Sequence, residues 1–158
     1  MLSEDLVVHN VTAVDVNGVT PGAWLRVSDG RVAELGIGEG WPRSVGLAID
    51  GSGGNLTPGF IDIHAHGGGG YSNEDGLEAI FGALASHHRH GTTRAVASFV
   101  AAPLGALERA LSSVAELSAR NPLLLGSHLE GPFLATDTAG PVTLVQLRHR
   151  RKRHVTQR

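Results

Sequence analysis

The chain has 158 residues, of which 22 are glycine, 41% are hydrophobic and 18% are charged, and its net charge is −2. This composition excludes a disordered polyelectrolyte, and the length fits one ordinary domain or a small domain with part of a larger one. The lack of cysteine excludes disulfides and thiolate ligands, and an aromatic content of 4% argues against nucleic-acid binding by base stacking. No apolar stretch is long enough to span a bilayer, and the acidic N-terminus is unlike a signal peptide. We therefore expect a cytoplasmic protein with no membrane partner.

Residues 1–56 are predicted to form a small antiparallel β subdomain. Short apolar runs alternate with turn signals, of which Asn17-Gly18 and Asp29-Gly30 are the strongest. A glycine-rich segment, residues 50–57, marks the end of this part.

Residues 57–140 are predicted to alternate between strand and helix in the order β-α-β-α-β. Apolar runs at 60–66, 92–100 and 123–130 indicate strands, and the two segments between them repeat apolar residues at helical spacing. The first helix is expected to begin near Ser72-Asn73 and to bury four apolar side chains. These are Leu77, Ile80, Phe81 and Leu84. Such alternation predicts an α/β fold with a parallel sheet.

Side chains that can bind metal gather where two of these strands end. Because successive strand residues point to opposite faces, Asp62, His64 and His66 share one face of the first strand, opposite an apolar face suited to packing under helices. By the same rule His128 and Glu130 share a face of the third strand. The sequence therefore predicts that His64, His66 and Glu130 converge on one divalent metal.

Each of these residues also has a purely structural interpretation. The histidine pair and Glu130 could be polar strand ends exposed to water, and His128 could be a core histidine bonded to backbone. The run Gly67–Gly70 permits close backbone approach to a bound group, or forms a flexible loop. Three further histidines are assigned to the last turn of the first helix and not to a metal. They are His87, His88 and His90.

Two segments resemble a known family. The segment from Leu56 to Gly70 resembles the first barrel strand of the amidohydrolase superfamily, and His128–Leu134 narrows the resemblance to N-acetylglucosamine-6-phosphate deacetylases. Gly91-Thr92-Thr93 also fits, and the similarity covers about residues 5–140. It implies the first three βα units of a TIM barrel, incomplete here, preceded by half of a β-sandwich.

The resemblance further implies a metal-dependent hydrolase of amino-sugar metabolism. Its substrate is N-acetylglucosamine 6-phosphate, its cofactor is one or two divalent ions (zinc or iron), and it forms a homodimer. Glu130 matches the family's metal-binding glutamate, and His64 and His66 match the pair that holds a second metal. The general-base aspartate and the phosphate-binding groups of the family lie beyond the matched stretch, so no catalytic residue is assigned in this chain.

The isolated chain is therefore expected to be inactive or nearly so. The alternatives are a non-catalytic fragment that binds metal weakly, and another amidohydrolase of the dihydroorotase type. The expected inactivity rests on the general-base aspartate, since loss of a proton-transfer group alone lowers rates by about 10²–10⁴-fold.

Residues 141–158 form a basic tail of different composition. Residues 1–140 contain all 15 acidic and 7 of the 13 basic residues, a net charge of −8, whereas residues 141–158 contain six basic residues and no acidic one. The family resemblance stops at the same point. We interpret the tail as disordered or as the product of a frameshift near Gly140, which the other reading frames of the gene would test. A nucleic-acid-binding arm is the alternative, disfavoured because the tail has no aromatic residue.

Overall fold

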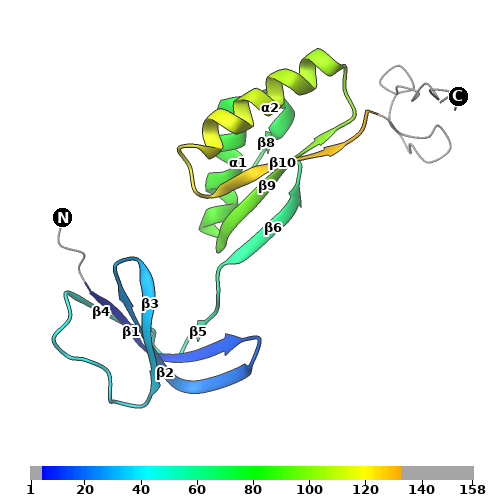
Figure 1. Cartoon of the computed structure of the whole chain (residues 1–158). Coiled ribbons are helices and arrows are strands. Elements are labelled where there is room, and N and C mark those ends of the chain that lie inside the picture. Colours follow the sequence, from blue (N-terminus) through cyan, green and yellow to red (C-terminus); the bar gives the residue numbers. More distant parts are fainter. Residues whose placement is uncertain (1–4, 133–158) are drawn as a thin grey trace, which may run out of the picture. The chain divides into compact units, whose positions relative to one another are not determined.

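The computed structural model describes residues 5–132, which form two compact units divided between Pro58 and Gly59 (Figure 1). The predicted tail, residues 141–158, lies outside the described residues. Within the described part of the chain, no helix is both long and apolar enough to cross a membrane.

The first unit is a five-stranded sheet in the order β3-β2-β1-β4, with β5 also paired to β1. Its strands are β1 (Leu6–Asp15), β2 (Gly18–Ser28), β3 (Arg31–Ile37), β4 (Leu47–Asp50) and β5 (Asn55–Leu56). The hairpins β1–β2 and β2–β3 turn where the sequence predicted. The expectation of a wholly antiparallel sheet is wrong, because β4 and β5 run parallel to β1. Between β1 and β4 the chain passes through β2, β3 and residues 38–46, and this long connection lets β4 return alongside β1 in the same direction.

One small apolar cluster forms the core of the first unit. Val7, Trp24 and Trp41 are buried together, and Trp41 stacks on the His9 ring at a centroid distance of 4.2 Å. Strands β3 and β4 carry large apolar side chains that remain exposed among the described residues. They are Val32, Leu35, Ile37, Leu47 and Ile49. The proposal that this unit is half of a β-sandwich remains a prediction.

Asp5 links the start of β1 to β2. Its carboxylate accepts hydrogen bonds from Ser28 Oγ at 2.7 Å and from Arg26 Nη1 at 2.8 Å. The Ser28 hydrogen bond holds the pKa of Asp5 below its ordinary value, against partial desolvation and with help from Arg26. Because the folded-state pKa lies below the unfolded one, the stabilisation is present above pH 3.8 and is lost as pH falls through the folded-state value.

We therefore expect Asp5→Asn to lower the urea midpoint of the first unit at pH 7, and the difference from wild type to shrink on acidification below pH 4 or so. Tryptophan fluorescence measures this directly, because both tryptophans, Trp24 and Trp41, belong to this unit. Asp75→Asn, in the second unit, is the matched control. Equal midpoints for Asp5→Asn and wild type at pH 7 would contradict the assignment.

The second unit is a parallel three-stranded sheet in the order β10-β9-β6, with α1 and α2 as the connections. Its main elements are β6 (Phe60–Ala65), α1 (Leu77–Arg89), β9 (Thr92–Val100), α2 (Leu104–Ser118) and β10 (Leu124–Glu130). The predicted order of strands and helices and the α/β class are confirmed.

Both helices cover the same face of this sheet. One core cluster joins Ile80 and Leu84 of α1, Leu107 and Val114 of α2, and residues of the two strands beneath them. Those strand residues are Ala95, Ala97, Phe99 and Leu124. The opposite face of the sheet, which carries the candidate ligands, has no covering element in the described part of the chain.

Three apolar side chains differ from expectation. Phe81 is 53% exposed, because it lies beside the buried stripe of α1 and not on it. Ile61 and Ile63 are 63% and 71% exposed. They share the helix-covered face, but β6 is an edge strand that neither α1 nor α2 covers among the described residues.

The segment between β6 and α1 also differs from expectation. The glycine run forms a small hairpin, with β7 (Gly67–Gly68) antiparallel to β8 (Tyr71–Ser72). A 3₁₀ turn, η1 (Asn73–Asp75), follows, and α1 starts only at Leu77. The predicted helix start near Ser72-Asn73 is therefore too early, because Gly76, with φ of 100°, separates the turn from the helix.

Candidate metal centre

The candidate site lies at the carboxyl ends of β6 and β10, on the face of the sheet opposite the helices. His64 is the fifth residue of β6, His66 directly follows that strand, and His128 and Glu130 belong to the end of β10. Parallel strands present their carboxyl ends at one edge, so residues far apart in sequence meet there.

Glu130 contacts both histidines of the His-x-His pair. Its Oε1 lies 2.9 Å from His64 Nε2, and its Oε2 lies 3.5 Å from His66 Nε2. The two Nε2 atoms lie 3.2 Å from each other. The three predicted ligands therefore converge, although β9 separates their strands in the sheet.

His128 joins the same group. Its ring centroid is 5.0 Å from that of His64, and ligand atoms of His64, His128 and Glu130 all lie within 4.8 Å of one another. His128 is exposed, so the interpretation as a core histidine is wrong. The sequence left the role of His128 open, because a histidine near the end of a strand has the same local pattern whether it binds a metal or packs in the core.

A small residue of β9 permits this convergence. Ser98 pairs with His128 in the sheet and is fully buried, between the strands that carry the ligands. Ala97 and Phe99 pack under the helices, and successive strand residues point to opposite faces, so Ser98 between them points to the face that carries the ligands. A large side chain at this position would stand between His64 and His128.

The arrangement of donor atoms fits a divalent cation. Two imidazole nitrogens lie 3.2 Å apart with a carboxylate beside both, so nitrogen and oxygen donor atoms gather in one small volume. Imidazole nitrogen with carboxylate oxygen is the donor set of zinc and of non-haem iron. His64, His128 and Glu130 would hold such an ion. His66 is a further candidate ligand, because its Nε2 lies 3.2 Å from His64 Nε2 and 3.5 Å from Glu130 Oε2.

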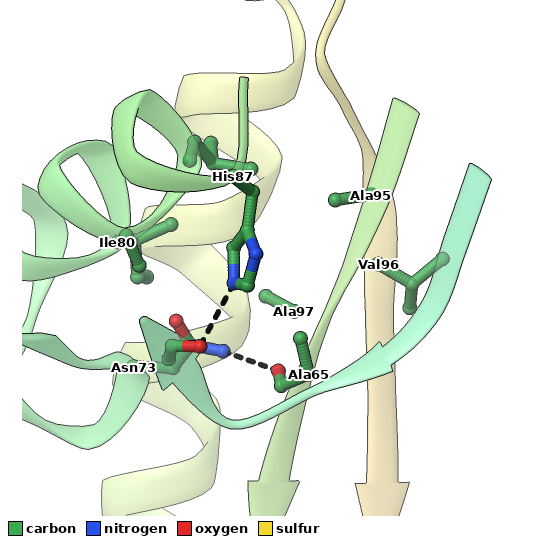
Figure 2. Close-up of a pocket in the computed structure, with 10 residues that line it drawn as sticks. Ala65, Asn73, Ile80, His87, Ala95, Val96 and Ala97 are labelled. Atoms are coloured by element: carbon green, nitrogen blue, oxygen red, sulfur yellow. Dashed lines mark hydrogen bonds between the residues drawn. The ribbon is translucent and has the colours of Figure 1, made fainter. Parts of the chain in front are cut away.

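Hydrogen bonds from η1 and α1 fix the backbone around His66. Asn73 Nδ2 donates to the carbonyl of Ala65 at 2.7 Å, and Asn73 N donates to that of His66 at 2.9 Å. His87 Nε2 lies 2.9 Å from the carbonyl oxygen of Gly67. Three successive carbonyl groups are thus bound, and Figure 2 shows Asn73 and His87 reaching toward this segment from η1 and α1.

The sequence assigned His87 only to the last turn of a helix. In the structure its side chain also contacts the backbone that follows β6. It lines a small space beneath α1 with Asn73 and apolar residues of the sheet (Figure 2). A β-carbon at Gly68 would lie 2.6 Å from His87 Nε2, so a larger residue there would displace the ring that contacts the Gly67 carbonyl. The glycine run approaches the protein's own side chains closely.

Glu74 is a carboxylate that the sequence assigned only to a helix start. It lies in η1, with its Oε1 3.8 Å from His66 Nδ1 and 3.3 Å from the donating N–H of Val100, and its Oε2 accepts from Ser72 Oγ. Burial alone raises the pKa of Glu74. The hydrogen bonds from Ser72 and from backbone N–H groups, together with His66, outweigh that effect and lower it.

The helices lie on one face of a parallel sheet, and histidine and glutamate side chains gather at its carboxyl edge. The chain is therefore an α/β protein with a candidate metal centre. No protein-family model matches the chain. It is 28% identical over 149 residues to N-acetylglucosamine-6-phosphate deacetylase of Bacillus subtilis (strain 168), a match that covers 88% of this chain and 37% of that protein. It is 33% identical over 120 residues to N-acetylgalactosamine-6-phosphate deacetylase of Escherichia coli O157:H7, covering 73% and 30%.

Solved structures agree. The Mycobacterium smegmatis N-acetyl-D-glucosamine-6-phosphate deacetylase superposes with a TM-score of 0.73 at 31% identity, over 92% of this chain and 40% of that one. The Pasteurella multocida deacetylase shares the fold, with a TM-score of 0.84 at 24% identity, over 91% and 38%. A shorter match, 39% identical over 62 residues, relates 39% of the chain to 13% of a D-hydantoinase of Rhizobium radiobacter.

The chain is therefore related to the N-acetylglucosamine-6-phosphate deacetylase family, as its motifs predicted. It spans 37% and 30% of the lengths of the two deacetylases named first, so it matches only about a third of each.

Proposed function

We propose that this chain supplies the first metal ligands of a deacetylase that acts on N-acetylglucosamine 6-phosphate or a close amino-sugar phosphate. The observation that carries the proposal is the convergence of His64, His128 and Glu130 from two strand ends, in a chain whose relatives are named deacetylases. The βα units correspond to the start of an amidohydrolase-type barrel.

The residues present support particular roles. A bound divalent ion would supply Lewis acidity toward an amide carbonyl and its attacking water. Glu130 reaches toward two histidines at once, so it would fix the relative position of His64 and His66. Asn73 and His87 hold the backbone that carries His66, and such support limits the loss of geometry when a ligand binds.

The second candidate is another ring- or amide-opening amidohydrolase. The D-hydantoinase match favours it, although over only 62 residues. Both candidates use the same candidate ligands, so the substrate and not the metal distinguishes them.

The test offers zinc-loaded chain either N-acetylglucosamine 6-phosphate or hydantoin. We expect release of acetate from N-acetylglucosamine 6-phosphate and no reaction with hydantoin. The rate is expected to be low, because His64 is 50% exposed and the site stays open to water in the described residues. Glu130→Ala is expected to abolish the activity. Ring opening of hydantoin would favour the second candidate. Zinc uptake with neither reaction would favour a non-catalytic metal-binding chain.

A further inference from the structure

His66 carries a buried nitrogen that has no hydrogen-bond partner. Its Nδ1 is shielded from solvent, and no polar atom of the described residues lies within hydrogen-bond range of it. A buried polar atom left without a partner destabilises the folded state, so a missing partner at this position calls for an explanation. The carboxylate of Glu74 faces this nitrogen, with Oε1 at 3.8 Å from Nδ1.

Glu74 is held in place by groups other than His66. Val100 N at the end of β9 and Ser72 Oγ donate to its two oxygens, one to each. The neighbouring Asn73 fastens η1 to the carbonyls of Ala65 and Ser98 through its side chain. The carboxylate thus comes from a turn already attached to both strands β6 and β9.

The other nitrogen of His66 points to the candidate metal centre. His66 Nε2 faces Glu130 Oε2 and His64 Nε2, so the ring spans the distance between the ligand group and Glu74. When one nitrogen of a histidine binds a metal, the other carries the proton, and its hydrogen-bond acceptor fixes the tautomer and the ring orientation.

We propose that Glu74 is the positioning residue of this centre: its carboxylate accepts a hydrogen bond from His66 Nδ1–H and so keeps Nε2 free to bind a metal. This inference rests on the proposed metal site. The 3.8 Å between Nδ1 and Glu74 Oε1 exceeds the upper end of the ordinary N–H···O range, about 3.2 Å, by about 0.6 Å.

The alternative role of Glu74 is that of an acid near the start of a helix. The structure disfavours it, because Glu74 precedes Gly76 and donor groups of β8 and β9 engage its oxygens. Asp75, the next residue of the same turn, makes no hydrogen bond or ion pair within the described part of the chain. It therefore provides a matched control.

The test combines zinc titration of the full chain with ¹⁵N NMR of the His66 ring, in zinc-free and zinc-loaded protein at a pH where imidazole is neutral. Wild type is expected to show the Nδ1–H form in both states. Glu74→Ala is expected to bind zinc about 10–100-fold more weakly and to lose the preference for Nδ1–H. Glu74→Gln, whose amide oxygen can still accept, is expected to lose less, and Asp75→Asn is expected to match wild type in both measurements.

The two readouts separate two failures. If wild type takes up no zinc, the proposed metal centre fails, while the tautomer of zinc-free His66 still decides the role of Glu74. An unchanged Nδ1–H signal in Glu74→Ala, or zinc affinity equal to wild type, overturns the proposal. Far-UV circular dichroism of each variant confirms that the comparison is between folded proteins.

Discussion

Glu130→Gln is expected to weaken zinc binding by more than about 100-fold, beyond the 10–100-fold loss typical of residues that only support a ligand. Glutamine keeps the shape of the side chain but removes its negative charge and replaces one oxygen by a donor. In the folded chain the two oxygens of Glu130 lie 2.9 Å from His64 Nε2 and 3.5 Å from His66 Nε2. An amide nitrogen at either place offers no lone pair to a cation.

Isothermal titration of metal-free chain with zinc measures this effect and also gives the number of ions bound. Glu108→Gln makes the same change of charge on the exposed surface of α2 and is expected to bind zinc like wild type. Zinc affinity of Glu130→Gln equal to that of Glu108→Gln would show that the ions bind elsewhere. The candidate centre, and the function proposed from it, would then have to be abandoned.

The sequence predicted the second unit well because its signals are local. The strand at Thr92–Val100 has the bounds expected from its apolar run, and the helical spacing located Ile80 and Leu84 in the core. The alternation of side chains along β6 placed His64 on the ligand face. These are properties of short segments that tertiary contacts reinforce.

What the sequence could not predict depends on contacts between distant segments. The parallel pairing of β4 with β1 follows from the path of the connection before it, which has no strong local signal. The position of His128 beside His64 depends on the register of β10 against β9. Acidic residues after a serine suggest a helix start, so Glu74 received a local role in place of its contact with His66.

Asn73 illustrates the same limit, because nothing in its neighbourhood distinguishes it from a surface turn residue. It is only 4% exposed, and its amide nitrogen donates to carbonyls 8 and 25 residues away, those of Ala65 and Ser98. Its backbone N–H binds the carbonyl of His66. The residue thus ties the segment of the candidate ligand His66 to the turn that carries Glu74.

Asn73→Asp is therefore expected to destabilise the second unit by about 3 kcal/mol or more at pH 7. The substitution preserves size but replaces the donating NH₂ by an oxygen, so that a buried carboxylate faces two carbonyl oxygens. Both hydrogen bonds are lost and the like partial charges repel. The folded state should raise the pKa of the new carboxyl, so lowering the pH should relieve part of the effect, since a protonated carboxyl can donate one bond.

Thermal unfolding followed by far-UV circular dichroism, with amide exchange of α1 and β9 by NMR, measures this loss at pH 7 and pH 5. Asn121→Asp is the matched control, because Asn121 Oδ1 accepts a hydrogen bond from Leu123 N and aspartate can do the same. The same chemical change should thus be nearly neutral at 121 and severe at 73. Similar stabilities of the two variants would mean that the Asn73 side chain does not donate to the Ala65 and Ser98 carbonyls. The backbone around His66 would then be held by the Asn73 N–H, the glycine hairpin and His87, without the Asn73 side chain.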